Sequence, residues 1–177
     1  MHPRTTELLE QLDTHRAALR RAVEEIPEPQ RERRPAPDRW SVAEVLEHLG
    51  LVEGSIARLL GGAIAGGLPP ERETSPVVDR LAPARIADRR RRVSSFEPVV
   101  PSGALDCAAA WAALERSREE LRAVVLAGDG LALGEIVHPH RILGPLDGYQ
   151  WVLFVAGHEA RHAAQIREIA AAPASGG

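Results

Sequence analysis

The feature that most constrains the fold is a set of four helix-length segments whose apolar residues recur at threes and fours. These segments cover about residues 6–26, 41–60, 106–126 and 147–171, and prolines and glycines separate them. Each segment would form an amphipathic helix with one face to bury. Helices of this kind cover one another's apolar faces, so the sequence predicts an all-α four-helix bundle.

Capping signals mark where three of these helices begin. Ser41 and Glu44 have the spacing of a capping box, in which each side chain bonds the other residue's backbone amide. Asp147 and Gln150 repeat that spacing at the start of the last helix. Asp106 is a predicted N-cap. The sequence therefore predicts these helix starts to within a residue or two.

The connections differ greatly in length. Residues 61–104 are rich in glycine and proline and form a long connection, which we expect to cross the bundle between the second and third helices. Residues 128–146 contain His138-Pro139 and Gly144-Pro145 and are predicted to be a loop. We expect one domain over residues 1–177, with residues 173–177 as a frayed tail.

Composition excludes several functions. The 177 residues include 22 basic ones, all arginine, yet the net charge is −3 and aromatic residues make up only 3%. A nucleic-acid-binding protein would carry a basic excess, so no nucleic-acid partner is expected. No apolar run approaches the ~18 residues of a membrane span, so no membrane partner is expected either. A single cysteine leaves no intrachain disulfide and fits the cytoplasm.

The residues with the clearest chemical signal are three histidines. His158 and His162 are four apart on a predicted helix, so their imidazoles lie on one face and can bind one metal ion. His48, on the inward flank of the second helix, offers a third nitrogen. Three protein ligands with one position left for water are typical of a catalytic metal site. The alternative is that His48 is an isolated polar residue near the bundle edge.

The string from His158 to His162 also matches the HExxH motif of zinc proteases. A metzincin would need glycine and histidine where this chain has Gln165 and Glu168. The protease interpretation is therefore rejected.

Three further residues are candidates for roles at this site. Arg118 and Glu159 are the candidate catalytic residues. Arg118 lies on an apolar stripe, where it could bind an anionic substrate or pair with a carboxylate; the favoured interpretation is a buried stem whose guanidinium reaches water. Glu44 lies one turn before His48 and could orient that imidazole from a second shell, beyond its capping role.

Two loop histidines and the single cysteine are further candidates. His138 or His140 could approach the metal, but a fourth imidazole would close the site. Cys107 could have a lowered pKa at a helix start. We expect instead that it packs as a small apolar residue.

The ordered set of motifs resembles the DinB-like, or DinB/YfiT-like, four-helix metalloproteins. The matching stretches are Trp40 to Leu49, Pro98 to Gly103, Ser117-Arg118, His138-Pro139, Gly144 to Leu146, Gln150-Trp151 and His158 to Ile166. The resemblance implies a DinB-like topology with a long crossover, often in a homodimer. It also implies a divalent metal, usually zinc or nickel, held by His48, His158 and His162.

Characterised members of that family include thiol-dependent enzymes, among them transferases that join bacillithiol or mycothiol to electrophiles and a mycothiol-dependent isomerase. The resemblance therefore implies a metal-dependent S-transferase acting on a small-molecule substrate with a low-molecular-weight thiol. The other candidate enzyme is a related hydrolase, in which the metal would activate water in place of the thiol. The alternative from another class is a non-catalytic metal- or ligand-binding bundle.

Overall fold

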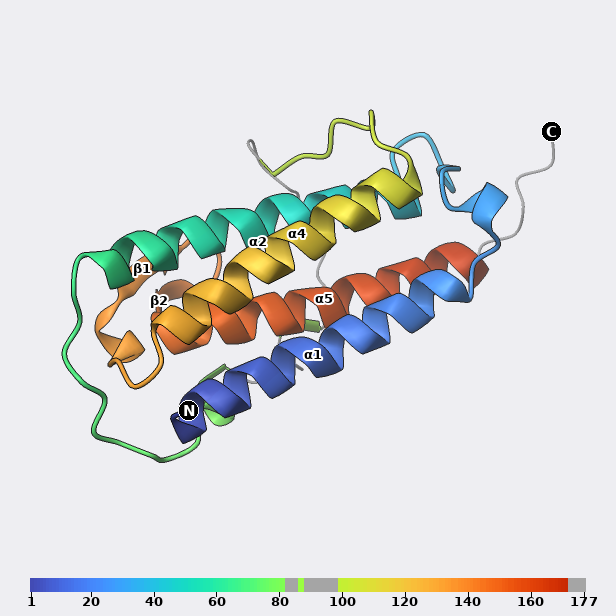
Figure 1. Ribbon diagram of the computed structural model, residues 1–177. Helices are drawn as coiled ribbons and strands as arrows, with labels where there is room; N and C mark the ends of the chain where they lie inside the picture. The colour runs from blue at the N-terminus through green and yellow to red at the C-terminus, as the bar shows by residue number, and fades with distance from the viewer. Residues whose placement is uncertain (82–85, 88–98, 172–177) are drawn as a thin grey trace.

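Four long helices lie side by side in the computed structural model, which describes residues 1–81, 86–87 and 99–171 (Figure 1). They are α1 (Pro3–Glu24), α2 (Val42–Ala65), α4 (Cys107–Ala127) and α5 (Gly148–Ala171). The α1 and α5 helices pack as one pair, and α2 and α4 pack as the other. The chain runs along α1 and α5 in one direction and along α2 and α4 in the opposite direction. The predicted all-α four-helix bundle is confirmed.

The long crossover is also present, because α2 and α4 run in the same direction and the chain between them must return along the bundle. Its first part pairs with the loop after α4: the Glu71 amide donates to Gly130 at 2.8 Å, and the Ala132 amide donates to Pro69 at 2.9 Å. A short 3-10 helix (Val78–Leu81) follows. Residues 99–103 then lie against the other end of α2. The crossover therefore spans the length of the bundle.

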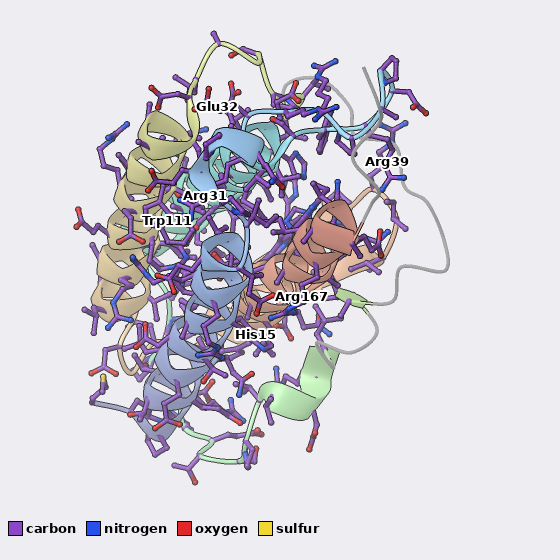
Figure 2. All side chains as sticks on the ribbon, turned by 90° about the vertical axis from the view of Figure 1, so that its right-hand side faces the viewer. His15, Arg31, Glu32, Arg39, Trp111 and Arg167 are labelled. Atoms are coloured by element: carbon purple, nitrogen blue, oxygen red, sulfur yellow. The ribbon has the colours of Figure 1, made fainter. Side chains whose placement is uncertain are left out.

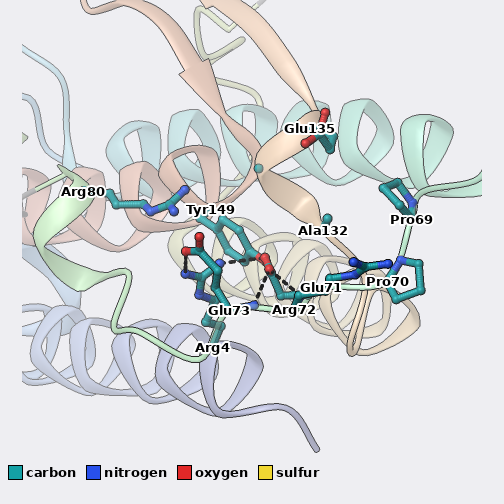
Figure 3. Close-up of a pocket in the computed structure, with 11 residues that line it drawn as sticks. Arg4, Pro69, Pro70, Glu71, Arg72, Glu73, Arg80, Ala132, Glu135 and Tyr149 are labelled. Atoms are coloured by element: carbon teal, nitrogen blue, oxygen red, sulfur yellow. Dashed lines mark hydrogen bonds and ion pairs between the residues drawn. The ribbon is translucent and has the colours of Figure 1, made fainter.

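A buried cluster fixes the crossover to the first turns of α1 and α5 (Figure 3). Arg4 donates to Glu71 at 2.6 Å, and the Tyr149 hydroxyl donates to the same carboxylate oxygen. Burial and the hydrogen bond to Glu71 together raise the pKa of Tyr149 to about 12. Burial alone would raise the pKa of Glu71, but the hydrogen bonds that this carboxylate receives lower it to about 2. The carboxylate is therefore held charged at this end of the bundle.

The predicted capping signals form as expected. The Ser41 hydroxyl accepts from the Glu44 amide at 3.2 Å, and the Ser41 amide donates to the Glu44 carboxylate at 2.9 Å. Asp147 and Gln150 make the same reciprocal pair, at 2.9 and 2.8 Å. Asp106 caps α4 by accepting from the Ala109 amide at 2.7 Å. Three helix starts are thus confirmed.

Two helices have bounds that differ from the sequence prediction: α1 begins and ends two or three residues earlier than expected, and α2 is longer. The α1 helix begins at Pro3, which is tolerated in a first turn, and the His2 ring accepts the Arg4 amide at 3.3 Å. The α2 helix continues through Gly61 and Gly62, where the sequence predicted its end. A Cβ at Gly61 would lie 3.4 Å from Val124 of α4. That is ordinary van der Waals contact, so Gly61 lies at the α2–α4 interface and does not end the helix.

The loop predicted for residues 128–146 contains regular structure, so that expectation was wrong in part. A 3-10 helix (Leu133–Glu135) precedes β1 (Val137–His140) and β2 (Gly144–Asp147), which form an antiparallel hairpin. Pro139 lies opposite Pro145, and prolines carry no amide hydrogen, so the sequence lacks a strand signal here. The His140 ring accepts the amides of Ile142 and Leu143 at 3.2 and 3.1 Å and so stabilises the turn.

The bundle core consists of two apolar clusters, one toward each end. In the first cluster, the α5 residues from Trp151 to Ala156 are all buried. The second contains the first half of α2 and the last turns of α1. Between the clusters, near the middle of every helix, lies a buried charged residue; these are Arg16, Glu53, Arg118 and Glu159.

Two other expectations concern the chain as a whole. The tail predicted at residues 173–177 lies outside the described residues. Among the helices that are described, none combines the length and the apolar character that crossing a lipid bilayer requires.

The capping box of α2 gives a stability prediction. Ser41→Ala removes the acceptor of the Glu44 amide and should lower the free energy of unfolding by about 1 kcal/mol in denaturant titrations. Ser55→Ala is the matched control, because the Ser55 hydroxyl only donates back to Val52 within the same helix. Equal stabilities of the two variants would contradict the capping role.

Candidate metal centre

Two helices supply the three histidines. His48 lies in the first half of α2, and His158 and His162 lie one turn apart on α5. His48 and His162 are 4% and 5% exposed, whereas His158 is only partly buried. The structure therefore brings together all three residues that the sequence singled out, and His48 is not isolated at the bundle edge.

The ring nitrogens converge on one point. Nε2 of His158 lies 3.1 Å from Nε2 of His162 and 3.4 Å from Nε2 of His48. One ligand atom from each of the three residues lies within 4.8 Å of the other two. Metal–nitrogen bonds of 2.0–2.1 Å at a tetrahedral angle would separate two ligand nitrogens by about 3.3–3.4 Å. Two of the three nitrogen pairs thus have almost the spacing that a zinc-like ion requires.

The hydrogen bonds outside the cluster determine which nitrogens carry protons. Nδ1 of His48 lies 2.7 Å from the Val99 carbonyl oxygen, and Nδ1 of His162 lies 2.9 Å from the Gln165 side-chain oxygen. These oxygens only accept, so both Nδ1 atoms are donors and both neutral rings present a lone pair at Nε2. Both lone pairs point to Nε2 of His158, which carries at most one proton. The cluster therefore has more lone pairs than protons at its centre, an arrangement suited to holding a cation.

Burial keeps these rings neutral. Desolvation lowers the pKa of His48, and the hydrogen bond to Val99 opposes it in part. Burial, followed by the neighbouring imidazoles, lowers the pKa values of His158 and His162 well below the usual range. Neutral imidazole is the form that binds metal ions.

The partner that orients His48 differs from the one the sequence suggested. Both carboxylate oxygens of Glu44 are bound by Arg34, and one also accepts the Ser41 amide. Glu44 therefore serves the helix cap, and the second-shell role expected for it falls to the Val99 carbonyl. Sequence reasoning missed Val99 because a backbone carbonyl leaves no signal in residue type.

Glu47, next to His48 in the chain, holds the segment that carries Val99. Its carboxylate accepts the Ser102 amide at 2.9 Å, the Ser102 hydroxyl at 2.7 Å and the Gly103 amide at 3.2 Å. Gly103 has a φ of +71°, which favours glycine over other residues. Glu47 thus fixes the end of the crossover against α2, within reach of the His48 ring.

Aromatic rings surround the cluster. Trp40 lies 5.0 Å from His48 between ring centroids, and Phe154 stacks on His158 at 5.2 Å with an interplanar angle of 17°. His140 packs on Phe154 at 4.6 Å and is not part of the ligand cluster. His138, on the same strand, is exposed. Neither loop histidine joins the three imidazoles in the described structure.

Arg118 and Glu159 do not occupy the positions that the sequence suggested. The guanidinium of Arg118 is buried rather than in water, so the favoured interpretation was wrong and carboxylate pairing is correct. It binds Glu53 and lies 3.0 Å from Glu159, which also accepts from Arg16. Both candidate catalytic residues are therefore engaged in a buried ion network that sequence reasoning did not identify.

Two cavities in the described structure lie away from the three histidines. One, of about 390 Å³, is lined by the Arg4, Glu71 and Tyr149 cluster (Figure 3). The other, of about 490 Å³, includes Cys107 and lies beside Arg31, Glu32 and Trp111; Figure 2 labels these last three side chains. Burial raises the pKa of Cys107, which agrees with the packing role expected for this residue.

The fold and the imidazole cluster together define a four-helix bundle with a candidate metal centre. The model of the DinB superfamily matches residues 11–166, and the chain belongs to that family. The uncharacterized protein YuaE of Bacillus subtilis (strain 168) is 28% identical over 136 residues, which cover 77% of this chain and 80% of YuaE. The crystal structure of TT2238, a four-helix bundle protein, matches with a TM-score of 0.59 and 23% identity over 93% of this chain and 98% of that one. The latter likeness shows the fold alone.

The Glu47 contacts give the first prediction at this site. Glu47→Ala removes the acceptor of the Ser102 and Gly103 amides, so hydrogen exchange at these amides should accelerate by about tenfold or more. Glu119→Ala is the control, because Glu119 is exposed on α4. Unchanged exchange at both amides in Glu47→Ala would show that Glu47 does not hold the segment.

The second prediction concerns pH. Because the folded chain depresses the pKa of His162, the unfolded chain binds more protons below about pH 6.5. The free energy of unfolding of chelator-treated protein should therefore fall on acidification from pH 7.5 to 5.5, by about 1.4 kcal/mol in total for each imidazole held fully neutral. His162→Ala should flatten this slope and exposed His138→Ala should not. An identical slope in His162→Ala would refute the assignment.

Proposed function

We propose that this protein binds one divalent metal ion through Nε2 of His48, His158 and His162, with zinc as the first candidate and nickel as the second. The observation that carries the proposal is the convergence of three imidazole nitrogens. Nε2 of His158 lies 3.1 Å from Nε2 of His162 and 3.4 Å from Nε2 of His48, and these nitrogens carry fewer protons than lone pairs. Membership of the DinB superfamily, a metal-binding family, supports it.

The proposed site is open to a further ligand. Among the described residues, no fourth histidine, cysteine, aspartate or glutamate belongs to the cluster. A divalent ion with three neutral ligands and an open position lowers the pKa of a bound thiol or water. This is the ligand pattern of catalytic rather than structural zinc sites.

The chain's own residues would prepare the site. Val99 and Gln165 hold the His48 and His162 rings in the tautomer that presents Nε2. Trp40 and Phe154 line the cluster with apolar surface, which limits water around it. An apolar surface beside the open position suits an electrophile with a hydrophobic body.

The function proposed is therefore that of a metal-dependent enzyme, a thiol-dependent S-transferase that joins a low-molecular-weight thiol to a small electrophile, or a related hydrolase. A small-molecule substrate, a homodimeric assembly and a cytoplasmic location belong to the same proposal. The small-molecule substrate follows from the apolar surface at the open site, and the single cysteine fits a reducing compartment.

A second candidate function is a non-catalytic metal- or ligand-binding bundle. One observation favours it: neither of the two cavities found includes any of the three histidines. In that case the metal would serve the stability of the bundle and would reach no substrate.

The metal assignment gives a direct prediction. Protein purified without chelator or added metal should contain about one divalent ion per chain by elemental analysis. His158→Ala removes the ligand shared by both close nitrogen pairs and should abolish stoichiometric metal. His138→Ala, on the exposed side of the hairpin, is the control and should retain it. Undiminished metal in His158→Ala would count decisively against the site.

A conjugation screen separates the functional candidates. Metal-loaded protein is incubated with a panel of small thiols and chlorodinitrobenzene, and thioether formation is followed. A thiol-dependent rate that is lost in His158→Ala supports the transferase. Ester turnover without thiol that is lost in the same variant supports the hydrolase. Full metal loading with neither activity supports the non-catalytic bundle.

A further inference from the structure

Each long helix contributes one buried charged residue at its middle, and the four side chains meet. We call them the charge quartet: Arg16 of α1, Glu53 of α2, Arg118 of α4 and Glu159 of α5. Glu53 and Glu159 are each 1% exposed, and the two arginines are buried as well. The two positive and two negative charges balance, as a buried ion network requires.

The connections within the quartet have a distinct pattern. The two carboxylates come from α2 and α5, the same helices that carry the three histidines. Arg16 contacts Glu159 at 2.8 Å and Glu53 at 2.9 Å, and so bridges the two helices. Arg118 bridges them a second time, from Nε to Glu53 and from NH2 to Glu159 at 3.0 Å. Two guanidiniums therefore tie α2 to α5.

Apolar packing alone specifies the position of α5 poorly. The residues from Trp151 to Ala156 are buried on every side of the helix, so burial does not distinguish one rotation from another. The quartet separates the two apolar clusters of the core. A slip of α5 by one turn, about 5.4 Å, would move Glu159 into one of these clusters without its partners. The ion network thus disfavours the rotations and one-turn slips of α5 that apolar packing alone would allow.

We propose that the charge quartet is a positioning device that sets the height and rotation of α5 against α2. Through this register it brings His158 and His162 to His48. Glu159 is adjacent to His158 in the chain, and Glu53 follows His48 on α2 by five residues. The part of the inference that concerns metal affinity rests on the proposed function, whereas the part that concerns register does not.

The decisive experiment measures register without metal. Arg58→Cys on α2 and Ala170→Cys on α5 are exposed positions for spin labels, in a Cys107→Ser background. Pulsed electron resonance then gives the distance distribution in chelator-treated full-length protein. The test variant replaces the quartet with apolar residues of similar size: Arg16→Met, Glu53→Leu, Arg118→Met and Glu159→Leu. Such replacements often preserve stability, which separates register from folding.

The expected result is one narrow distance with the native quartet and a distribution that is broadened or displaced by about 5 Å, one helical turn, in the apolar variant. Asp13→Asn is the matched control: it breaks the exposed ion pair with Arg122 between α1 and α4, and should leave the distance unchanged. A native distribution in the apolar variant overturns the proposal.

Glu159→Gln keeps the shape of the side chain and provides the second test. It leaves Glu53 as the one fully buried carboxylate for the two guanidiniums, because Glu115, which also contacts Arg16, is exposed to solvent. The distance distribution should therefore broaden, and Co²⁺ affinity should fall by roughly tenfold or more. Native distances together with native Co²⁺ affinity in Glu159→Gln overturn the proposal even if the apolar variant does not fold. Absence of Co²⁺ binding by the native chain would refute the proposed function, and the spin-label distances would then decide the register on their own.

Discussion

The architecture depends on one constraint, which is that α2 and α5 hold three neutral imidazoles against one another inside a bundle. Two of the rings are oriented by acceptors at Nδ1, so they present lone pairs to the third. Such a group is unfavourable in a low-dielectric interior unless a cation lies at its centre. The fold therefore maintains an arrangement that its own hydrogen bonds do not satisfy, and this is what the metal proposal explains.

Several features of α2 serve that arrangement in succession. The Ser41 capping box starts the helix, Glu47 holds the end of the crossover, His48 faces α5, and Glu53 joins the charge quartet. The crossover in turn supplies the Val99 carbonyl that orients His48. A few turns of α2 thus contain the residues that start the helix, hold the crossover, contribute an imidazole to the cluster and contact α5 through the charge quartet.

The sequence predicted what local periodicity and capping chemistry determine: four helices, three of their starts and the three histidines. It did not predict the hairpin, because paired prolines at 139 and 145 carry no strand signal. It also missed the charge quartet, although each member occupies an apolar stripe position, as Glu53 does between Leu49 and Ile56. A search for opposite charges at the midpoints of apolar stripes would have found all four. The Val99 contact was beyond reach, because only the folded chain determines which carbonyl meets an imidazole.

The most direct test of the central claim is X-ray absorption spectroscopy of the protein with its bound metal. We expect a first shell of three nitrogen ligands at about 2.0–2.1 Å, with the outer-shell scattering typical of imidazole, and one further light atom. A first shell dominated by oxygen or sulfur from the protein, or one without imidazole scattering, would contradict it.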